Sequence, residues 1–467
     1  MATFKHISDV RQIVENQMGK KILNIEWLDH VYTWMQWYSG KVDDFHKYRV
    51  YNGQQYVKQE RQSLGMPKIV SEDWASLLYN DKTDIKVDEA KQEELQEILD
   101  TNHFMSNFND FIEQYMAMGI GATVVFRDRL GKARIDFIKA PMVFPLAVEN
   151  GEVTSCAFAS VQDQYYYINI HEAQPNGSYK VTNTYWKIIG QGSAERIENK
   201  NVAEEYISPV KMFQIYKPAT SNNIDLFTPY GLSVYANGID QIKACDLVFD
   251  SFTNEFSIGR KRILIRQDAA DYKVQVNEKG EQTTVPLFDP TDTVFYRLPQ
   301  DDDHPSDPIH ELQSDLRTQD HIAGLQTALN LCSSACGLGM DRYEFKEGRI
   351  YVNNQQVIST QSKLYKNLLK HEKILRESLT EMVKSLFYAQ DMAVYTGDVS
   401  IDFDDSLIED SESIQRRALL ELNSGLIDPI EYFVQVYKYT EEQAEEFVNK
   451  IRGRQPKPEE EPEPEGE

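Results

Sequence analysis

The sequence predicts an α+β fold, because helical and strand-like stretches occupy separate parts of the chain. Apolar residues recur at helical spacing in residues 1–116 and alternate as in β-strands from 120 to 217. Helical spacing then returns in three long segments after residue 228. With 467 residues, 41% of them hydrophobic and 26% charged, the chain is long enough for several compact units with buried cores.

Helices are expected first. Residues 1–40 predict two helices, the second of which is rich in tryptophan. Residues 66–80 predict a third helix with Pro67 in its first turn, where the missing backbone N–H is harmless. Residues 87–116 continue with helical spacing, and glycines at 119 and 121 mark the change of period.

The region 120–217 is predicted to be mostly antiparallel β-structure. Glu149-Asn150-Gly151 is a candidate hairpin turn, because Asn and Gly accept positive φ angles. Strands are also expected within residues 259–300 and as a short pair within 392–406.

Long helices are expected around these later strands. Their predicted ranges are 229–258, 307–336 and 359–390, with two C-terminal helices at 410–424 and 428–452. In the second range the apolar stripe changes phase between Leu316 and Ile322, which predicts a kink or a change of packing neighbour. The Pro- and Glu-rich end, 454–467, cannot bury apolar area and is expected to be disordered.

The composition bounds the classes of function. A net charge of −25 disfavours a protein that grips nucleic acid, although DNA could slide past such a surface. The N-terminus lacks an apolar signal-peptide core, and no stretch reaches the roughly 18 apolar residues of a membrane span. The four cysteines are too few and scattered for a disulfide framework, which fits a reducing cytoplasm.

Signatures of catalysis are missing from the sequence. It has no phosphate-binding loop, no dinucleotide G-x-G-x-x-G, no G-x-S-x-G and no H-E-x-x-H. Cys332 and Cys336 are one helical turn apart, but core thiols are favoured over a metal site. His371 lies in an apolar stripe and is interpreted as a packed residue rather than a ligand. No catalytic residue, cofactor or metal is therefore expected.

Two charged clusters have competing interpretations. The acids Asp402, Asp404 and Asp405, like those at 301–303, are favoured as solvated caps over a cation or glycosidic site. The basic run 260–262 is favoured as a complement to a helix C-terminus over a phosphate contact.

Four segments in order along the chain carry a resemblance to a known family. They are RQSLGMPKIVSEDWASLLYND, YGLSVYANGIDQIKACDLVFDSFTNEFSIGRKRILI, VISTQSKLYKNLLKHEKILRESLTEMVKSLF and SIDFDDSLIEDSESIQRRALLELNSGLIDPIEYF. Together they resemble the portal proteins of tailed, long-tailed (siphovirus-type) bacteriophages over most of residues 20–450. At 353–356 the sequence Asn-Asn-Gln-Gln departs from the Thr-Ala-Thr-Glu-like run of that family, so the channel-loop limits are not fixed.

The resemblance implies an α+β phage portal fold with wing, stem helices, α/β clip, channel (tunnel) loop and helical crown. The implied division is a wing, first stem helix, clip, second stem helix, channel loop, long wing helix with strands, crown and disordered acidic tail. The corresponding ranges are 1–228, 229–262, 263–306, 307–337, 338–358, 359–404, 405–453 and 454–467.

The implied function is a homododecameric ring at one capsid vertex that forms the channel for viral genome packaging and DNA ejection. Implied partners are the terminase large subunit, a head-completion adaptor, capsid and scaffold proteins, and double-stranded DNA that passes through non-specifically, with no membrane. The implied location is the virion, after assembly in the host cytoplasm. The alternatives are another head-tail connector ring, which is usually shorter, an acidic carbohydrate-cleaving enzyme, and a cytoplasmic scaffold for host proteins, which would not form a closed ring.

Site residues follow from the same resemblance. The DNA-channel candidates are Asp307, Glu311, Asp315, Arg317, Arg342 and Lys346. The clip residues expected to bind partners are Tyr272, Asp289, Phe295 and Tyr296.

Overall fold

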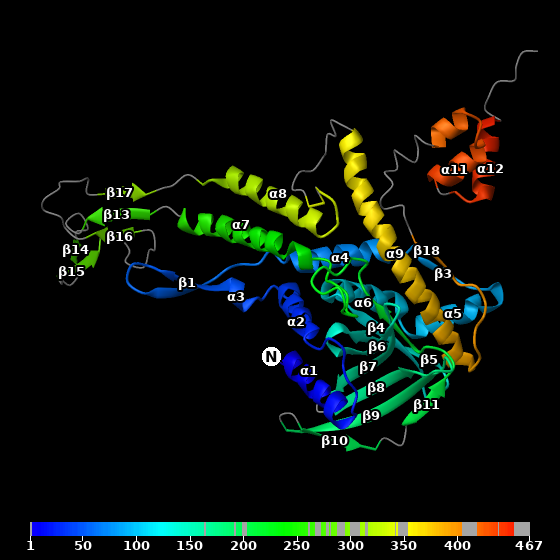
Figure 1. Ribbon diagram of the computed structural model, residues 1–467. Coiled ribbons are helices and arrows are strands. Elements are labelled where there is room, and N and C mark those ends of the chain that lie inside the picture. Colours follow the sequence, from blue (N-terminus) through cyan, green and yellow to red (C-terminus); the bar gives the residue numbers. More distant parts are fainter. Residues whose placement is uncertain are drawn as a thin grey trace, which may run out of the picture. The chain divides into compact units, whose positions relative to one another are not determined.

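The computed structural model describes most of the chain (Figure 1). The described residues are 2–162, 165–190, 193–198, 203–259, 262–266, 272–276, 280, 282–286, 295–298, 309–312, 316–340, 342–343, 354–403, 418–437 and 439–452. They form a mixed helix and sheet structure in two compact units. Unit 1 comprises Met1–Leu78 and Val87–Ser400, and unit 2 comprises Tyr79–Lys86 and Ile401–Glu467. No helix within the described ranges combines the length and apolar character that a bilayer crossing requires.

The N-terminal helices are confirmed. They are α1 (Ala2–Gln12) with a π-helical turn (Ile13–Gln17), α2 (Trp27–Tyr38), the short α3 (Asp43–His46), α4 (Met66–Leu78), α5 (Glu89–Thr101) and α6 (Phe104–Met118). The expected continuous stretch 87–116 is divided between α5 and α6, because His103 adopts a left-handed backbone with φ of 49°.

The β region 120–217 is also confirmed. Its strands are β4 (Gly121–Arg127), β5 (Ala133–Lys139), β6 (Val143–Glu149), β7 (Glu152–Gln162), β8 (Tyr165–Ala173), β9 (Tyr179–Gly190), β10 (Ser193–Ile197), β11 (Glu205–Ser208) and β12 (Phe213–Tyr216). They form a six-stranded sheet ordered β10-β9-β8-β7-β6, with β11 also on β9, and a three-stranded sheet ordered β12-β4-β5. The predicted turn between β6 and β7 is present, with positive φ at Asn150 and Gly151.

An aromatic core joins α6 to the three-stranded sheet. The ring of Phe111 lies 5.4 Å from Phe137 on β5 and 5.2 Å from Tyr216 on β12. Helix α9 (Asn354–Asp391) packs across this sheet (Figure 1), with Leu379 and Leu386 fully buried. Burial of such side chains contributes roughly 1.5–3 kcal/mol each, so this layer is a stabilising core of unit 1.

The helix predicted at 229–258 begins later than expected. A short 3-10 turn (Ala236–Gly238) precedes α7 (Ile239–Ile258), and residues 229–235 are not helical. Gly231 lies so close to Gly119 that a Cβ on Gly231 would be 2.2 Å from the Gly119 carbonyl oxygen. The Val234 N–H also donates to the Met116 carbonyl at 3.1 Å. These contacts with the end of α6 replace the first turns of the predicted helix.

The helix predicted at 307–336 was wrong in its first part. Strand β17 (Ile309–Leu312) lies there instead, and α8 begins later, at Thr318–Ala335. The change of apolar phase after Leu316 marks this beginning of a helix, and not a kink. The strand forms because its backbone pairs antiparallel with β13 (Arg262–Arg266).

The strands expected within 259–300 are present. Besides β13 they are β14 (Tyr272–Val276), β15 (Gln282–Pro286) and β16 (Phe295–Leu298). Strand β13 pairs in parallel with β16, and β14 forms a hairpin with β15. The α/β clip predicted at 263–306 is represented by strands in the residues described.

The remaining elements bring further corrections. Helix α9 matches the range predicted at 359–390 and extends beyond it at the N-terminal side. The strand pair predicted within 392–406 is wrong, because β18 (Ser400–Asp402) pairs with β3 (Asp84–Lys86). The hairpin of β1 (Lys47–Tyr51) and β2 (Tyr56–Glu60) was not predicted.

The C-terminal part of unit 2 is helical, as expected. Residues 418–423 are helical, and the single helix predicted at 428–452 is divided into α11 (Pro429–Tyr437) and α12 (Glu441–Arg452). Thr440 and Gln443 exchange side-chain and backbone hydrogen bonds at the start of α12. This capping box starts a new helix and explains the division. The predicted tail 454–467 lies outside the described residues.

Candidate channel and docking elements

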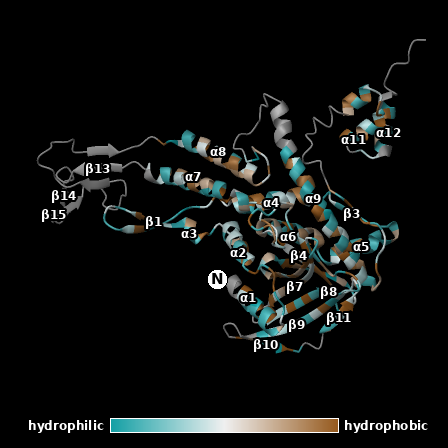
Figure 2. Ribbon diagram, viewed as in Figure 1, coloured by the Kyte–Doolittle hydropathy of each residue, from teal (hydrophilic) through white to brown (hydrophobic). Residues whose placement is uncertain are grey.

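Helices α7 and α8 form a closely packed antiparallel pair (Figure 1). A Cβ on Gly238 at the start of α7 would lie 2.9 Å from the Cys336 sulfur after α8, and one on Gly324 would lie 3.8 Å from Val248. The absence of a side chain at Gly238 thus lets the two helices approach. In Figure 2 both helices carry hydrophilic as well as hydrophobic residues along their length.

Three buried cysteines lie where these helices meet. Cys245 on α7 and Cys332 on α8 are fully buried, and Cys336 is 3% exposed. The hydrogen bond to Cys332, followed by burial, raises the pKa of the Cys245 thiol. The three cysteines therefore fill the core, in line with the interpretation favoured from sequence for Cys332 and Cys336.

A buried carboxylate fastens the chain before α4 to helix α7. Asp246 is fully buried and accepts hydrogen bonds from the Leu64 N–H at 2.7 Å and the Ser63 hydroxyl at 3.2 Å. Its other oxygen lies 3.1 Å from His46 Nε2. One turn along α7, Asp250 accepts from the Gln62 N–H at 3.0 Å. Residues 62–64 are thus held along α7 by two acids.

The far end of the helix pair is closed by an ion pair. Arg317, the residue before α8, donates from Nε and Nη2 to Glu255 on α7 at 3.1 and 2.8 Å. The hydrogen bond from Arg317 lowers the pKa of Glu255 to about 2. His321 lies 3.6 Å from the same carboxylate. Arg317, a predicted channel residue, is therefore paired, although its side chain is 67% exposed.

The chain leaving α8 is fastened to two other helices. Trp74 on α4 donates from Nε1 to the Cys336 carbonyl at 3.1 Å, and Asn367 on α9 donates to the Gly337 carbonyl at 2.9 Å. Arg342, another predicted channel residue, contacts Asp73 on α4 with N–O distances of 3.3 and 3.4 Å. The base of the predicted channel loop is therefore anchored by α4 and α9.

The other predicted channel residues are not brought together in the described structure. Glu311 lies on strand β17 opposite Ile263, and not on a helix as predicted. Asp307, Asp315 and Lys346 lie outside the described residues.

The clip candidates lie on strands where they are described. Tyr272 is in β14 opposite Pro286, and Phe295 and Tyr296 are in β16 opposite Ile263 and Leu264. Asp289 lies outside the described residues.

Two side chains with competing interpretations have defined surroundings. His371 on α9 is 7% exposed, and its Nδ1 accepts the Ala219 N–H at 3.0 Å, which makes it a packed residue. Asp402 forms an ion pair with Lys86 at 2.7 Å across the β3–β18 pair. The other acids of both clusters, Asp301, Asp302, Asp303, Asp404 and Asp405, lie outside the described residues.

Within the ranges given above, no group of three or more His, Cys, Asp or Glu side chains is arranged to hold a metal ion. The side chains that were singled out instead make structural contacts between helices. The contacts described here fix the relative placement of α4, α7, α8 and α9, which is a framework role.

Comparison with solved structures gives remote likenesses to parts of a gene transfer agent (GTA) particle. The neck of an empty GTA particle, computed with C6 symmetry, matches at 11% identity and a TM-score of 0.39, over 79% of this chain and 88% of that chain. The neck of a native GTA particle, computed with C12 symmetry, matches at 10% identity and 0.40, over 80% and 90%. The virion of a native gene transfer agent particle matches at 10% and 0.40, over 87% and 92%.

At these scores the structural likeness is remote, and no curated protein matches the chain. The assignment rests on a family model, that of the phage portal protein, SPP1 Gp6-like, which matches residues 20–457. Because that match covers nearly the whole sequence, the chain belongs to the SPP1 Gp6-like family of phage portal proteins.

Proposed function

We propose that this portal protein forms a closed homododecameric ring at one capsid vertex and is the channel for DNA packaging and ejection. The terminase large subunit would dock on it during packaging, and a head-completion adaptor would dock afterwards. Capsid and scaffold proteins would contact the wing. The proposal adds these assembly and docking roles to the family membership.

The antiparallel pair of α7 and α8 carries the proposal. The chain leaves α7, forms the β13–β17 strands and returns through α8. This order supports stem helices at 239–258 and 318–335, a clip that includes the strands from β13 to β17, and a channel loop between α8 and α9. The remaining divisions proposed are a wing at 1–228 and 359–404, a crown at 405–453 and an acidic tail at 454–467.

Charge supports a channel that does not hold DNA. Each subunit has a net charge of −25, and a ring repeats every exposed acid once per subunit. A wall of such charge repels phosphate and lets a duplex slide. The residues proposed to face the channel are those near Asp307, Glu311, Asp315, Arg317, Arg342 and Lys346.

Mass and shape test the ring. Light scattering of the purified full-length chain, together with negative-stain imaging, is expected to show closed rings of about a dozen subunits with a central hole. Ring formation depends on concentration, so the measurement is repeated over a concentration series. A chain that remains monomeric at the highest concentration would refute the proposal.

Docking through the clip is tested separately. Alanine at Tyr272 and Tyr296 is expected to leave the ring intact and to weaken binding of the terminase large subunit. The matched control is alanine at Tyr56, an exposed tyrosine of the β1–β2 hairpin. Equal terminase binding by both variants would remove the clip from the proposal.

A further inference from the structure

An ordered loop displays two large apolar side chains almost wholly to solvent. In the segment 221–228, Leu226 is 80% exposed and Phe227 is 91% exposed. The loop is shaped by its own side chains: Asn222 Oδ1 accepts the N–H of Ile224 at 2.9 Å, and Asp225 Oδ1 accepts that of Phe227 at 2.9 Å. Such Asx turns fix a short backbone segment.

The same loop is fastened to the body of unit 1. Asn24, just before α2, donates to Asp225 Oδ2 at 3.2 Å. At the base, the Ala219 N–H donates to His371 on α9, and the Lys217 ammonium donates to the Pro229 carbonyl at 3.2 Å. A loop held in one conformation loses little entropy on binding, so its exposed apolar residues are well suited as anchors in an interface.

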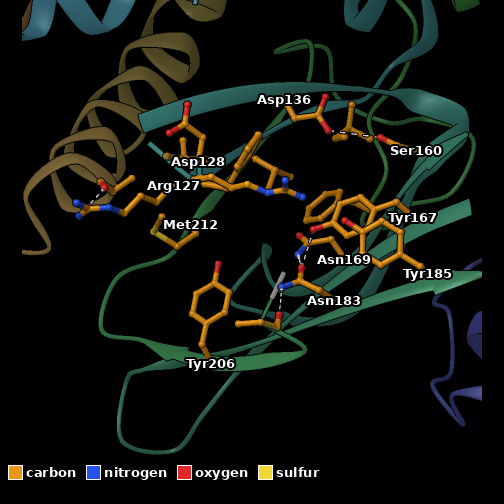
Figure 3. Close-up of a pocket in the computed structure, with 18 of the residues that line it drawn as sticks. Arg127, Asp128, Asp136, Ser160, Tyr167, Asn169, Asn183, Tyr185, Tyr206 and Met212 are labelled. Carbon is orange, nitrogen blue, oxygen red and sulfur yellow. Dashed lines mark hydrogen bonds between the residues drawn. The ribbon is translucent and has the colours of Figure 1, made fainter. Parts of the chain in front are cut away.

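A large aromatic cavity lies elsewhere on unit 1. It has a volume of about 980 Å³ and is lined by β4, β5, β7, β8, β9, β11 and the end of α9. Figure 3 shows Tyr167, Tyr185 and Tyr206 around it. Two of its lining side chains, Phe126 and Met392, are 42% and 59% exposed. Exposed apolar surface that is gathered at a concavity marks an interaction site.

The unpaired basic groups of the cavity and the acid of the loop have opposite charges. Arg127 and Arg129 line the cavity and form no ion pair within the described part of the chain. The Arg127 guanidinium donates instead to the Gln390 carbonyl at 3.1 Å. Of the acids that also line the cavity, Asp128 is paired with Arg134 and Asp136 is half-buried beside Ser160, whereas Glu198 is exposed. On the loop, Asp225 lies next to the two apolar anchors, and its carboxylate has amide donors as its described partners. Opposite charges around apolar anchors set the register of an interface.

The loop cannot reach the cavity of its own chain. The loop base is bound to His371, whereas Tyr388 lines the cavity 17 residues further along α9. At about 1.5 Å per residue these points are about 25 Å apart. Phe227 is two residues from the fastened Pro229, a reach of about 7 Å. The 221–228 loop can therefore enter such a cavity only on another molecule.

We propose that the 221–228 loop of one copy docks into the aromatic cavity of the next copy in the ring. Leu226 and Phe227 enter the cavity, and Asp225 faces Arg127 and Arg129. Different surfaces of the two copies meet, so the contact is heterologous and repeats around a closed ring. This inference rests on the proposed ring and names one contact that builds it.

Paired cysteines test the contact in the assembled full-length protein. All four native cysteines are buried, so they leave the background low. The variant with both Phe227→Cys and Met392→Cys is expected to give, on mild oxidation, a ladder of disulfide-linked subunits on a non-reducing gel. Each single variant, and the pair Phe227→Cys with Tyr56→Cys on the β1–β2 hairpin, is expected to give no ladder.

A substitution in the loop gives a second readout. Phe227→Glu should fold normally, since the side chain is exposed, and should raise the concentration needed for ring formation at least about 30-fold, the loss expected for an interface anchor. Phe227→Leu keeps an apolar side chain and should raise the concentration needed for ring formation much less.

The outcomes separate this inference from the proposed function. If the wild type forms rings but the variant with Phe227→Cys and Met392→Cys gives no ladder, the loop contact is overturned and the ring is not. The same holds if Phe227→Glu forms rings at the same protein concentration as the wild type. A wild-type chain that forms no ring at all would overturn both. A ladder specific to the Phe227 and Met392 pair supports both.

Discussion

Removal of the Asp246 carboxylate should strongly destabilise the framework around α7. In Asp246→Ala, the Leu64 N–H and the His46 Nε2–H lose their acceptor in a place where water does not reach. Each buried donor left without a partner costs about 1–3 kcal/mol. Together they should lower the free energy of unfolding by about 3–5 kcal/mol, the range for a broken buried charged network.

The same helix provides a matched control. Asp240 is 87% exposed and forms a surface ion pair with Lys243 at 3.0 Å. Asp240→Ala removes the same chemical group from α7 and should cost less than about 1 kcal/mol.

The free energy of unfolding of Asp246→Asn should lie between those of Asp246→Ala and Asp240→Ala. The Val42 N–H donates to His46 Nδ1, so the imidazole donates from Nε2 to Asp246. An asparagine keeps an acceptor for Leu64, but its NH₂ group faces this donor unless the imidazole changes tautomer. A loss of about 1–2 kcal/mol is expected.

Urea unfolding measures these differences through tryptophan fluorescence, because the Trp37 ring lies 5.8 Å from that of His46. Amide hydrogen exchange at residues 62–64 adds a local readout, and faster exchange is expected in Asp246→Ala. Equal urea midpoints for Asp246→Ala and Asp240→Ala would show that the buried carboxylate does not hold the segment 62–64 against α7.

Three other changes have defined outcomes. Gly119→Ala should lower the free energy of unfolding by more than about 1 kcal/mol, because Gly119 has a φ of +79° and an added Cβ would lie 2.6 Å from a carbonyl oxygen. Gly53 also has a positive φ but faces open space, so Gly53→Ala should lower the free energy of unfolding less in the same urea titration. Burial lowers the pKa of His371 to about 4, so below about pH 6.5 the unfolded chain takes up a proton that the folded chain does not. The free energy of unfolding of the wild type should therefore fall by about 3 kcal/mol between pH 6.5 and 4, and that of His371→Gln should fall less. The four buried thiols should react with an aromatic disulfide reagent only as fast as the chain unfolds, and rapid labelling of the native protein would contradict their burial.

Periodicity in the sequence predicts the elements whose stability is local. The apolar stripe of α9 and the Asn150-Gly151 turn are confirmed, because both depend on neighbouring residues alone. The missed β1–β2 hairpin also had a local signal, since Asn52-Gly53 lies between Tyr51 and Tyr56. The Thr440–Gln443 capping box could likewise have been predicted from the sequence, because Thr and Gln stand three residues apart.

Other elements depend on contacts between distant residues. Residues 229–235 have a helical pattern, but the approach of Gly231 to Gly119 and the hydrogen bond from the Val234 N–H to the Met116 carbonyl keep them out of the helix. Strand β17 forms because β13 lies beside it in space. Tertiary contacts of this kind override local propensity, and a single sequence does not reveal them.

The sequence predicted the protein family, but not the contacts that hold the helices α4, α7, α8 and α9 together. The order of segments led to the portal family, which the family match confirms. The carboxylate of Asp246 was not singled out, because an acid on a helix gives no local sign of being buried. Arg317 and Arg342 were predicted as channel residues, and the structure adds that each is bound to an acid of a neighbouring helix.

These pairings change what the net charge of −25 means for a channel. On α7, Glu255 is neutralised by Arg317, and Asp246 and Asp250 are buried and accept internal hydrogen bonds, so none of these acids presents a free carboxylate to a duplex. Asp240 on the same helix is exposed. The repulsion that a ring offers to DNA depends on acids of this second kind, repeated by symmetry. The exposed acids, and not the total, therefore decide whether the wall is slippery to a duplex.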